Sequence, residues 1–222
     1  MGSEDPESYS RDIGPDPTGR GIEDPPGATM DTPTKTTSTH NVKHLPVSAA
    51  LPMALDMVAL DAARQGIDQG AVMPGFAPWR AGIIALLNDS LATELVCVLC
   101  YKRHHFTAQG LASPKIADEF LVHANEEAAH ADRIAQRIVQ LGGDPDFSPD
   151  SLTARSHAAY DDSEDLKAMI RANLVAERVA IEAYSQMVAL VGDKDPTTRR
   201  LLEDILADEQ QHAEELRDWL AD

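Results

Sequence analysis

Apolar residues recur with a helical period in four long stretches of the chain between residues 80 and 220. Glycine and proline interrupt this period at Gly110, from Gly142 to Pro145, and at Pro196. The pattern therefore predicts four helices of roughly 28 residues, each about 40 Å long. The expected ranges are 80–109, 113–141, 163–191 and 196–220.

The lengths of the connections predict how these helices pack. Short connections join the first helix to the second and the third to the fourth, whereas residues 143–162 form one long crossover. Short loops favour antiparallel neighbours, so the expected fold is all-α, an up-down-down-up four-helix bundle with one long crossover. Ser113, followed by Pro114, and Ser163 are expected to cap the second and third helices.

The chain before the bundle divides into two segments. Residues 1–44 are rich in proline, glycine, serine, threonine and acids without an apolar period, and are expected to form a disordered acidic tail. Residues 45–80 are expected to form a short helix, from about residue 48 to 65, and a linker. Leu51, Leu55, Val58 and Ala62 make an apolar stripe on this helix, which we expect to pack on the bundle or on a neighbouring subunit. The bundle itself is expected over residues 81–222.

Two helices carry the same motif, a glutamate followed three residues later by a histidine, 82 residues apart. Residues three apart share one face of a helix, so each motif offers a carboxylate and an imidazole to one point. A glutamate in each preceding helix repeats as well, at a spacing of 83. This is the ligand set of carboxylate-bridged two-metal bundles. The candidate ligands are Glu94, Glu127, His130, Glu177, Glu209 and His212.

The chemistry of this set indicates which cations it would hold. Four carboxylates offset the charge of two divalent ions, and together with two imidazoles they suit iron, manganese or zinc. Without a metal, carboxylates among apolar neighbours would lack partners, at several kcal/mol each. The net charge of −18 also favours cations, and it argues against nucleic acid as a partner.

Several residues near these motifs admit two interpretations each. Cys97 either faces the site as a thiol or ligand, or fills space as a small apolar residue. His123 is either an outer ligand on an access path or a hydrogen-bonded structural histidine. Tyr184 either supports the site or only packs. His104 and His105 are interpreted as solvated. Outer faces are expected for Glu126, Glu182, Glu214 and Glu215.

Segments around these motifs resemble bacterioferritin over about residues 82–220, and the resemblance implies a ferritin-like fold. It also implies ferroxidase activity, in which peroxide or dioxygen oxidises Fe(II), and storage of Fe(III) mineral inside a hollow homo-oligomeric shell. The segments that carry it are Thr93–Val96, Glu127–Arg133, Gln140–Gly143, Leu174–Glu177, and Asp208–His212 with Trp219.

The same resemblance implies a role for each candidate residue. Glu127 and Glu209 would bridge two iron ions. Glu94 and Glu177 would be terminal ligands, and each histidine would hold one ion. Tyr101 matches a tyrosine beside the site. Ala128 stands where bacterioferritin has its haem-ligating methionine, so no haem is expected.

The family's short fifth helix has no counterpart after the fourth helix, which favours a shell of twelve subunits over one of 24. Dps-like mini-ferritins form such shells but place iron between subunits, so the expected centre is of the bacterioferritin type, within one subunit. One alternative with the same ligands is a di-iron or di-manganese peroxidase or catalase. Another is a Dps-like DNA-protecting mini-ferritin, which the net charge opposes.

Two further observations indicate the cellular compartment of the protein. No apolar run reaches about 18 residues and no signal peptide opens the chain, so we expect a cytoplasmic protein without a membrane partner. Cys97 and Cys100 are badly placed for a mutual disulfide on one helix, which agrees with a reducing compartment.

Overall fold

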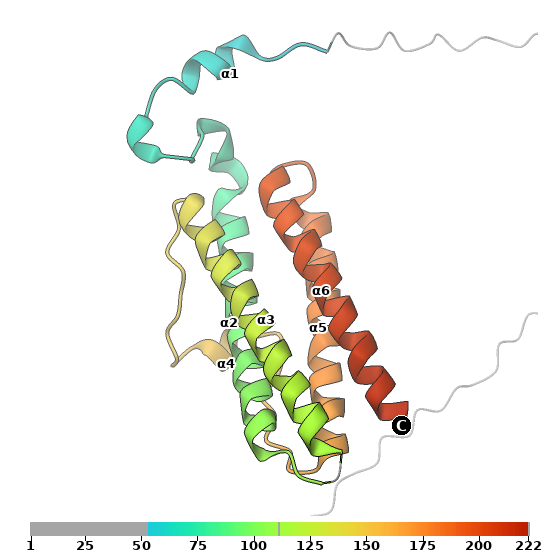
Figure 1. Ribbon diagram of the computed structural model, residues 1–222. Helices are drawn as coiled ribbons and strands as arrows, with labels where there is room; N and C mark the ends of the chain where they lie inside the picture. The colour runs from blue at the N-terminus through green and yellow to red at the C-terminus, as the bar shows by residue number, and fades with distance from the viewer. Residues whose placement is uncertain (1–52, 111, 222) are drawn as a thin grey trace, which may run out of the picture. The chain divides into compact units, whose positions relative to one another are not determined.

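A computed structural model of the chain describes residues 53–110 and 112–221, so the tail expected over residues 1–44 lies outside the described residues. Four long helices form an antiparallel bundle (Figure 1). The bundle confirms the all-α prediction, and each long helix begins and ends within three residues of its expected range. These helices are α2 (Ala77–Thr107), α3 (Ser113–Gln140), α5 (Leu166–Val191) and α6 (Pro196–Ala221).

The crossover between the two helix pairs runs back along the bundle and contains one short helix, α4 (Leu152–Arg155), which packs against α2 (Figure 1). Arg155 holds it in place by donating hydrogen bonds to the Asn88 carbonyl of α2 at 2.7 Å and to the Asp146 carbonyl at 2.9 Å. The Asn88 side chain donates in turn to the Asp144 carbonyl at 3.2 Å. Side chains of α2 thus satisfy the backbone of a long connection that has little structure of its own.

Two expected helix caps are wrong. Ser113 is the first residue of α3 rather than its cap, and its hydroxyl donates to the Gly110 carbonyl at 2.7 Å. Helix α5 is capped by Asp165, two residues after Ser163, because the Asp165 carboxylate accepts from the backbone N–H of Ala168 at 2.9 Å. An ionised carboxylate satisfies a free N–H of the first helical turn better than a hydroxyl does.

The short helix before the bundle, α1 (Met57–Ala62), covers only part of its expected range, of which residues 48–52 lie outside the described residues. Asp56 begins it by accepting from two backbone N–H groups, at 2.9 and 3.1 Å. Leu55 and Val58 are 77% and 80% exposed, so the expected packing on the bundle of the same chain is wrong. Packing on a neighbouring subunit stays a prediction. The expected linker contains two 3-10 turns, η1 (Ile67–Gln69) and η2 (Pro74–Phe76).

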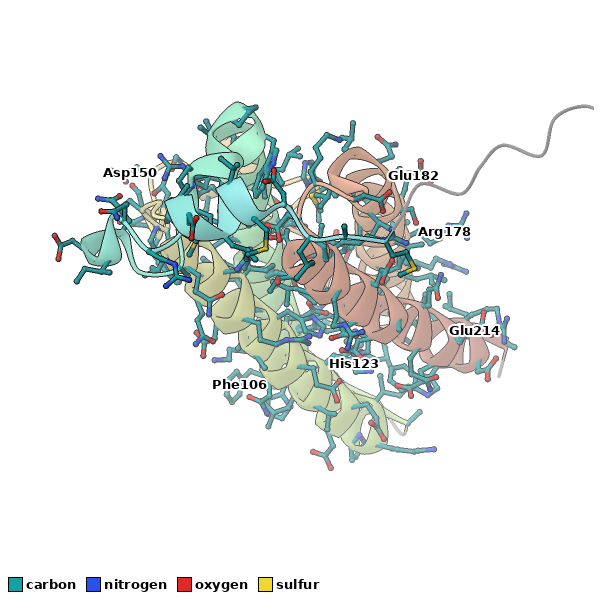
Figure 2. All side chains as sticks on the ribbon, turned by 90° about the horizontal axis from the view of Figure 1, so that it is seen from above. Phe106, His123, Asp150, Arg178, Glu182 and Glu214 are labelled. Atoms are coloured by element: carbon teal, nitrogen blue, oxygen red, sulfur yellow. The ribbon has the colours of Figure 1, made fainter. Side chains whose placement is uncertain are left out.

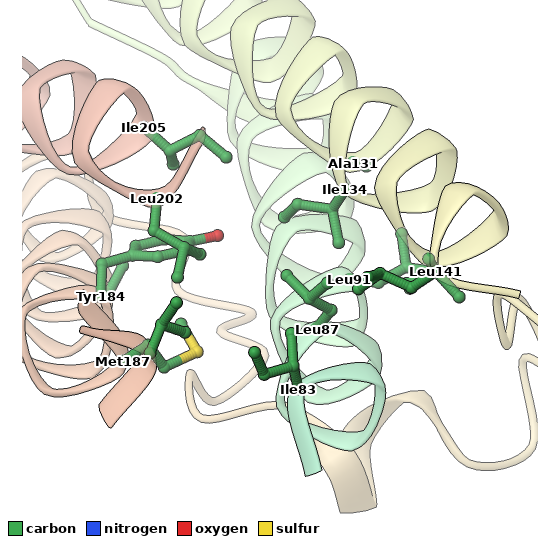
Figure 3. Packing of buried hydrophobic residues seen from close by; sticks show 13 residues of the cluster. Ile83, Leu87, Leu91, Ala131, Ile134, Leu141, Tyr184, Met187, Leu202 and Ile205 are labelled. Carbon is green, nitrogen blue, oxygen red and sulfur yellow. The ribbon is translucent and has the colours of Figure 1, made fainter. Parts of the chain in front are cut away.

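The buried apolar residues form two clusters, separated along the helices by a polar band. One cluster joins residues of all four long helices, among them Leu87, Ile134, Met187 and Ile205 (Figure 3). The other gathers around Phe120 and includes Met169 and Leu216. All six candidate ligands lie between these clusters in the order of residues along each helix.

Helix α2 with its preceding turn, Pro74–Thr107, is apolar and long enough to cross a membrane by length and composition alone, with a mean hydropathy of 1.8. Its apolar stretch is 61% buried inside the bundle, as is usual for a core helix. The apolar character of α2 therefore follows from its packing against the other long helices.

A buried ion pair closes the end of the bundle where α6 begins. Asp195 precedes Pro196 and caps α6 by accepting from the backbone N–H groups of Thr197 and Thr198 at 3.2 and 3.1 Å. Arg137 of α3 donates to both Asp195 oxygens, at 2.9 and 2.8 Å, and its Nε donates to the Thr198 hydroxyl at 2.8 Å. Burial raises the pKa of the Asp195 carboxyl, but these donors outweigh burial and lower it.

We expect Asp195→Ala to reduce the free energy of unfolding by about 3–5 kcal/mol, because the change removes a helix cap and leaves the Arg137 guanidinium buried without its partner. Folding lowers the pKa of Asp195 below its ordinary value of 3.8. The difference in free energy of unfolding between wild type and the variant should therefore be fully present above pH 3.8. It should disappear as the pH falls through the pKa of Asp195 in the folded protein. Asp193→Ala is the control: Asp193 is fully exposed, and its removal should change stability by less than about 1 kcal/mol. Urea unfolding would measure the stability of both variants. Equal losses of stability in Asp195→Ala and Asp193→Ala would contradict the assigned role of the Arg137–Asp195 ion pair.

Candidate metal centre

The structure brings all six candidate ligands together in the middle of the bundle. Each of the six residues is 3% exposed or less. Their N and O atoms form two overlapping groups, each with all of its atoms within 4.8 Å of one another. The first group is Glu94, Glu127, His130 and Glu209, and the second is Glu127, Glu177, Glu209 and His212.

The two glutamates shared by these groups each face both histidines. Glu127 places one oxygen 3.5 Å from His130 Nδ1 and the other 3.2 Å from His212 Nδ1. Glu209 does the same, at 3.2 and 3.6 Å. Glu94 lies 3.4 Å from His130 alone, and Glu177 lies 3.8 Å from His212 alone. Glu127 and Glu209 are thus shared between the two histidines, whereas Glu94 and Glu177 each face one.

The facing atoms of the cluster are close but do not bond one another. Among the described residues, eight buried side-chain atoms lack a hydrogen-bond partner, and six of them belong to these ligands. The six include Nδ1 of both histidines and both oxygens of Glu209. Buried polar atoms are ordinarily paired, so convergent unpaired acceptors and imidazole nitrogens fit divalent cations in the space between them.

Tyrosines hold the two terminal glutamates from the opposite helix pair. Tyr101 of α2 donates its hydroxyl to Glu177 of α5, and Tyr184 of α5 donates to Glu94 of α2. Both phenol rings are 1% exposed. The crossed pair repeats the twofold relation of the sequence repeat, so the interpretation of Tyr184 as a support for the site holds alongside its packing role.

Carboxylates on the other side of the centre orient the histidines. Asp208 of α6 lies 3.1 Å from His130 Nε2, and Glu126 of α3 lies 2.9 Å from His212 Nε2. With Nε2 facing an outer carboxylate, each Nδ1 faces the centre. Sequence reasoning placed Glu126 on an outer face and missed Asp208. A signal was present, since an acid directly precedes the glutamate of both Glu-x-x-His motifs.

The surroundings of the centre raise the pKa values of four of its six candidate ligands. Burial, reinforced by Glu127 and Glu209, raises the pKa of the Glu94 and Glu177 carboxyls well above the ordinary range. Burial lowers the pKa of the two imidazoles, but the carboxylates around them outweigh it, raising the pKa of His212 to about 10 and that of His130 further. The cluster thus needs positive charge, which protons or metal cations can supply.

His104 and His105, near the end of α2, both have specific partners. His104 is fully buried between Asn173 and Asp161, at 3.1 and 3.4 Å, so its interpretation as a solvated residue is wrong. His105 is half-buried and lies 2.6 Å from the Ala117 carbonyl, so that interpretation is wrong for it too.

Cys97 is a buried free thiol. Burial and the four nearby glutamates raise the pKa of Cys97 well above its usual value, so it stays protonated. Cys100 is also a free thiol and accepts from the backbone N–H of Asp161 at 3.3 Å. Both positions agree with small buried residues better than with a metal-binding thiolate.

A cavity of about 330 Å³ opens between α3 and α6 and reaches the centre from outside. Both ligand histidines line it, together with Asp208 and Glu126. None of the four ligand glutamates lines it. The cavity therefore brings accessible space up to the outer nitrogens of the two histidines on the α3–α6 face.

Comparison with known proteins agrees with this geometry. A family model described as a ferritin-like domain matches residues 84–222. Bacterioferritin of Desulfovibrio desulfuricans is 29% identical over 137 residues, 60% of this chain and 71% of that protein. A nutrient stress-induced DNA-binding protein of Synechococcus is 29% identical over 138 residues, 61% of this chain and 78% of that protein.

Solved structures show the same relationship. A dodecameric thioferritin, the bacterioferritin-related protein of Bacteroides fragilis, superposes with a TM-score of 0.62 at 30% identity, covering 64% of this chain and 86% of that one. The Desulfovibrio desulfuricans bacterioferritin with a diiron site superposes with a TM-score of 0.59 at 25% identity, covering 66% and 82%. The family match spans the bundle from within α2 to its end, and the chain is a member of the ferritin-like family, with bacterioferritins among its relatives.

Proposed function

We propose that this chain is a ferroxidase and iron-storage or detoxification protein that oxidises Fe(II) at a two-metal centre within each subunit. The proposed ligands are Glu94, Glu127, His130, Glu177, Glu209 and His212, with Tyr101 beside them. The observation that carries the proposal is the placement of Glu127 and Glu209, each with one oxygen toward each histidine. Manganese or zinc would fit the same donor atoms.

The protein's own groups would prepare two Fe(II) substrate ions for oxidation. The four carboxylates match the charge of the two ions, and the buried position keeps the field between them strong. With hydrogen peroxide as the oxidant, each Fe(II) ion gives one electron, and the peroxide takes up two protons and leaves as two water molecules. Tyr101 and Tyr184 keep the terminal glutamates in place through this change of charge.

The cavity beside the ligand histidines favours a ferroxidase, whose iron is a substrate, over a peroxidase or catalase, whose metals stay bound. The α3–α6 cavity brings the outer faces of His130 and His212 into contact with solvent-filled space. Carboxylates Glu126 and Asp208 on the same wall attract cations. An open, acidic approach suits iron that enters and leaves in each cycle.

The DNA-protecting alternative has one supporting observation, the relative named a nutrient stress-induced DNA-binding protein. The net charge of −18 opposes it, because binding to phosphates needs a basic surface. We therefore propose Fe(II), an oxidant (peroxide or dioxygen) and copies of the same chain as the partners, in the cytoplasm. The absence of haem at the position of Ala128 stays a prediction.

Replacing a terminal or histidine ligand should abolish rapid Fe(II) oxidation. We expect Glu94→Ala and His130→Ala to oxidise Fe(II) at least about 100-fold more slowly than wild type, since each change removes a donor atom from one metal position. The matched control is Glu182→Ala, which changes an exposed glutamate of α5 whose carboxylate accepts from Gln186 of the same helix. The absorbance of the ferric product, followed after Fe(II) is added in air, gives the oxidation rate of each of the three variants. Wild-type rates in both ligand variants would place oxidation elsewhere.

Metal binding should release protons, because four groups of the metal-free centre have raised pKa values: Glu94, Glu177, His130 and His212. Ligands must lose these protons to bind a cation, so metal affinity should rise with pH. We expect titration calorimetry of Zn(II) binding at pH 7, in buffers of different ionisation enthalpy, to detect release of up to four protons per chain. Binding with no proton release and no pH dependence would contradict the assigned protonation.

We propose that the chain assembles into a shell of twelve subunits. The dodecameric thioferritin relative supports this number. Exposed apolar side chains such as Leu55, Val58, Phe106 and Val175 offer surface for contacts between subunits. Light scattering coupled to size exclusion should give twelve times 24.0 kDa, about 288 kDa. A mass of one or two chains would remove the storage function and favour the peroxidase or catalase alternative.

A further inference from the structure

Residues 53–62, which end with α1, expose five large apolar side chains to solvent. These side chains are Met53, Leu55, Met57, Val58 and Leu60, and each is at least 44% exposed. No residue of α1 is buried. An exposed apolar surface of this kind marks a contact with another segment or another molecule. The segment therefore needs a complementary apolar surface.

The bundle has an apolar groove of about 620 Å³ on its α2–α5 face. Half-buried Val179 and Ala183 of α5 line this groove together with half-buried Leu86 of α2. Val175 and Leu190, which line it farther along α5 in either direction, are 61% and 58% exposed. The described part of the chain thus leaves the groove open.

The groove and the segment match in length. Val175 and Leu190 lie about 22 Å apart along α5, at the helical rise of about 1.5 Å per residue. In the segment, residues 53–56 precede α1 without regular structure, and α1 adds six helical residues. Together these two parts span up to about 22 Å. One segment can therefore extend along the whole groove.

One edge of the groove is polar and carries a positive charge. Arg178 and Glu182 lie on this edge, on the outer side of α5 (Figure 2). Glu182 accepts a hydrogen bond from Gln186 at 2.8 Å, whereas Arg178 has no ion pair or hydrogen bond with any described residue. Residues 53–62 contain two acids, Asp56 and Asp61, and no base. Both cap bonds of α1 use the same Asp56 oxygen, which leaves the other oxygen available to accept from Arg178.

The path of the linker favours the groove of a second copy over the groove of the same chain. The side chains of Val72 and Arg80 lie beside Gly142, at the end of α3. Phe76 packs on the apolar cluster next to them. The linker is therefore held at the α3 end of the bundle, whereas the groove lies between α2 and α5.

We propose that residues 53–62 of one chain dock in the α2–α5 groove of a second copy, with Asp56 paired to Arg178. Leu55 then lies beside Val175, and α1 follows the groove toward Leu190. Each chain offers one segment and one groove, so every groove of a closed assembly can be filled. This contact rests on the proposed assembly of the chain into a shell.

Cross-linking between two single-cysteine variants tests the contact. Full-length chains with Leu55→Cys and with Val175→Cys are produced together and treated with a short bis-maleimide. Wild type controls for its two native thiols, which are buried. We expect a product of about 48 kDa, twice the 24.0 kDa of one chain, only when both variants are present.

The matched control replaces Val175→Cys with Val122→Cys, on an exposed valine of α3 outside the groove. This pair should give at least about tenfold less product, because the reagent joins only thiols that are held near each other. Adding Arg178→Glu to the Val175→Cys chain should lower the yield at least about threefold, because it places two acids opposite each other.

The outcomes separate this contact from the proposed assembly and from the proposed function. A yield no higher than that of the Val122→Cys control would overturn the contact, while a shell mass in light scattering would leave the assembly standing. A two-chain product from Leu55→Cys alone would also overturn it, because two α1 segments would then meet each other. A chain that carries both changes and links only within itself would place the segment in its own groove and overturn the second copy as its partner. A product that needs both thiols and Arg178 supports the contact, whatever the rate of Fe(II) oxidation.

Discussion

Four carboxylates buried in one band of the core are the constraint on which the rest of this structure depends. Glu94, Glu127, Glu177 and Glu209 lie between two apolar clusters, where water cannot separate their charges. Each would be costly alone, and each repels the others. The bundle offsets this with two histidines, two phenol donors and, as we propose, two metal cations. The positions of the tyrosines and of the outer carboxylates are explained by the same need.

The two sides of the centre differ in their exposure to solvent. On the α2–α5 side, Tyr101 and Tyr184 hold the terminal glutamates with rings that are 1% exposed, which closes this side to solvent. On the α3–α6 side, Asp208 and Glu126 hold the histidines and also line a cavity. The closed side holds the terminal glutamates in place, and under the proposed function the open side is where cations would exchange. An accessible cavity on one face and rigid packing on the other fit a protein that binds and releases its metal substrate.

Much of the fold and the convergence of the six candidate ligands could be predicted from the sequence because the chain repeats itself. A periodic pattern of apolar residues and a motif that occurs twice leave few alternative arrangements. Helix caps were predicted less well: Asp165 rather than Ser163 begins α5, because several acceptors in one short segment compete for the same N–H groups. The burial of His104 was also missed, since a position beside Lys102 and Arg103 gave no local sign of the core face it occupies.

Residues that orient the site were the least predictable part. Glu126 and Asp208 are partly exposed acids on helix surfaces, and only the distance to a histidine of another helix distinguishes them from solvated acids. The interaction between His123 and Glu215 joins residues 92 positions apart and depends on how α3 and α6 face each other. Such contacts between helices follow from the packing of the bundle rather than from any local pattern.

Anomalous diffraction at the iron edge, from crystals loaded with Fe(II) without oxygen, tests the central claim most directly. The account predicts two iron peaks roughly 3.5–4 Å apart, with Glu127 and Glu209 bridging them and one histidine on each ion. It also predicts that Tyr101 and Tyr184 still bond to Glu177 and Glu94. A single peak, or iron bound only outside the band between the two apolar clusters, would contradict it.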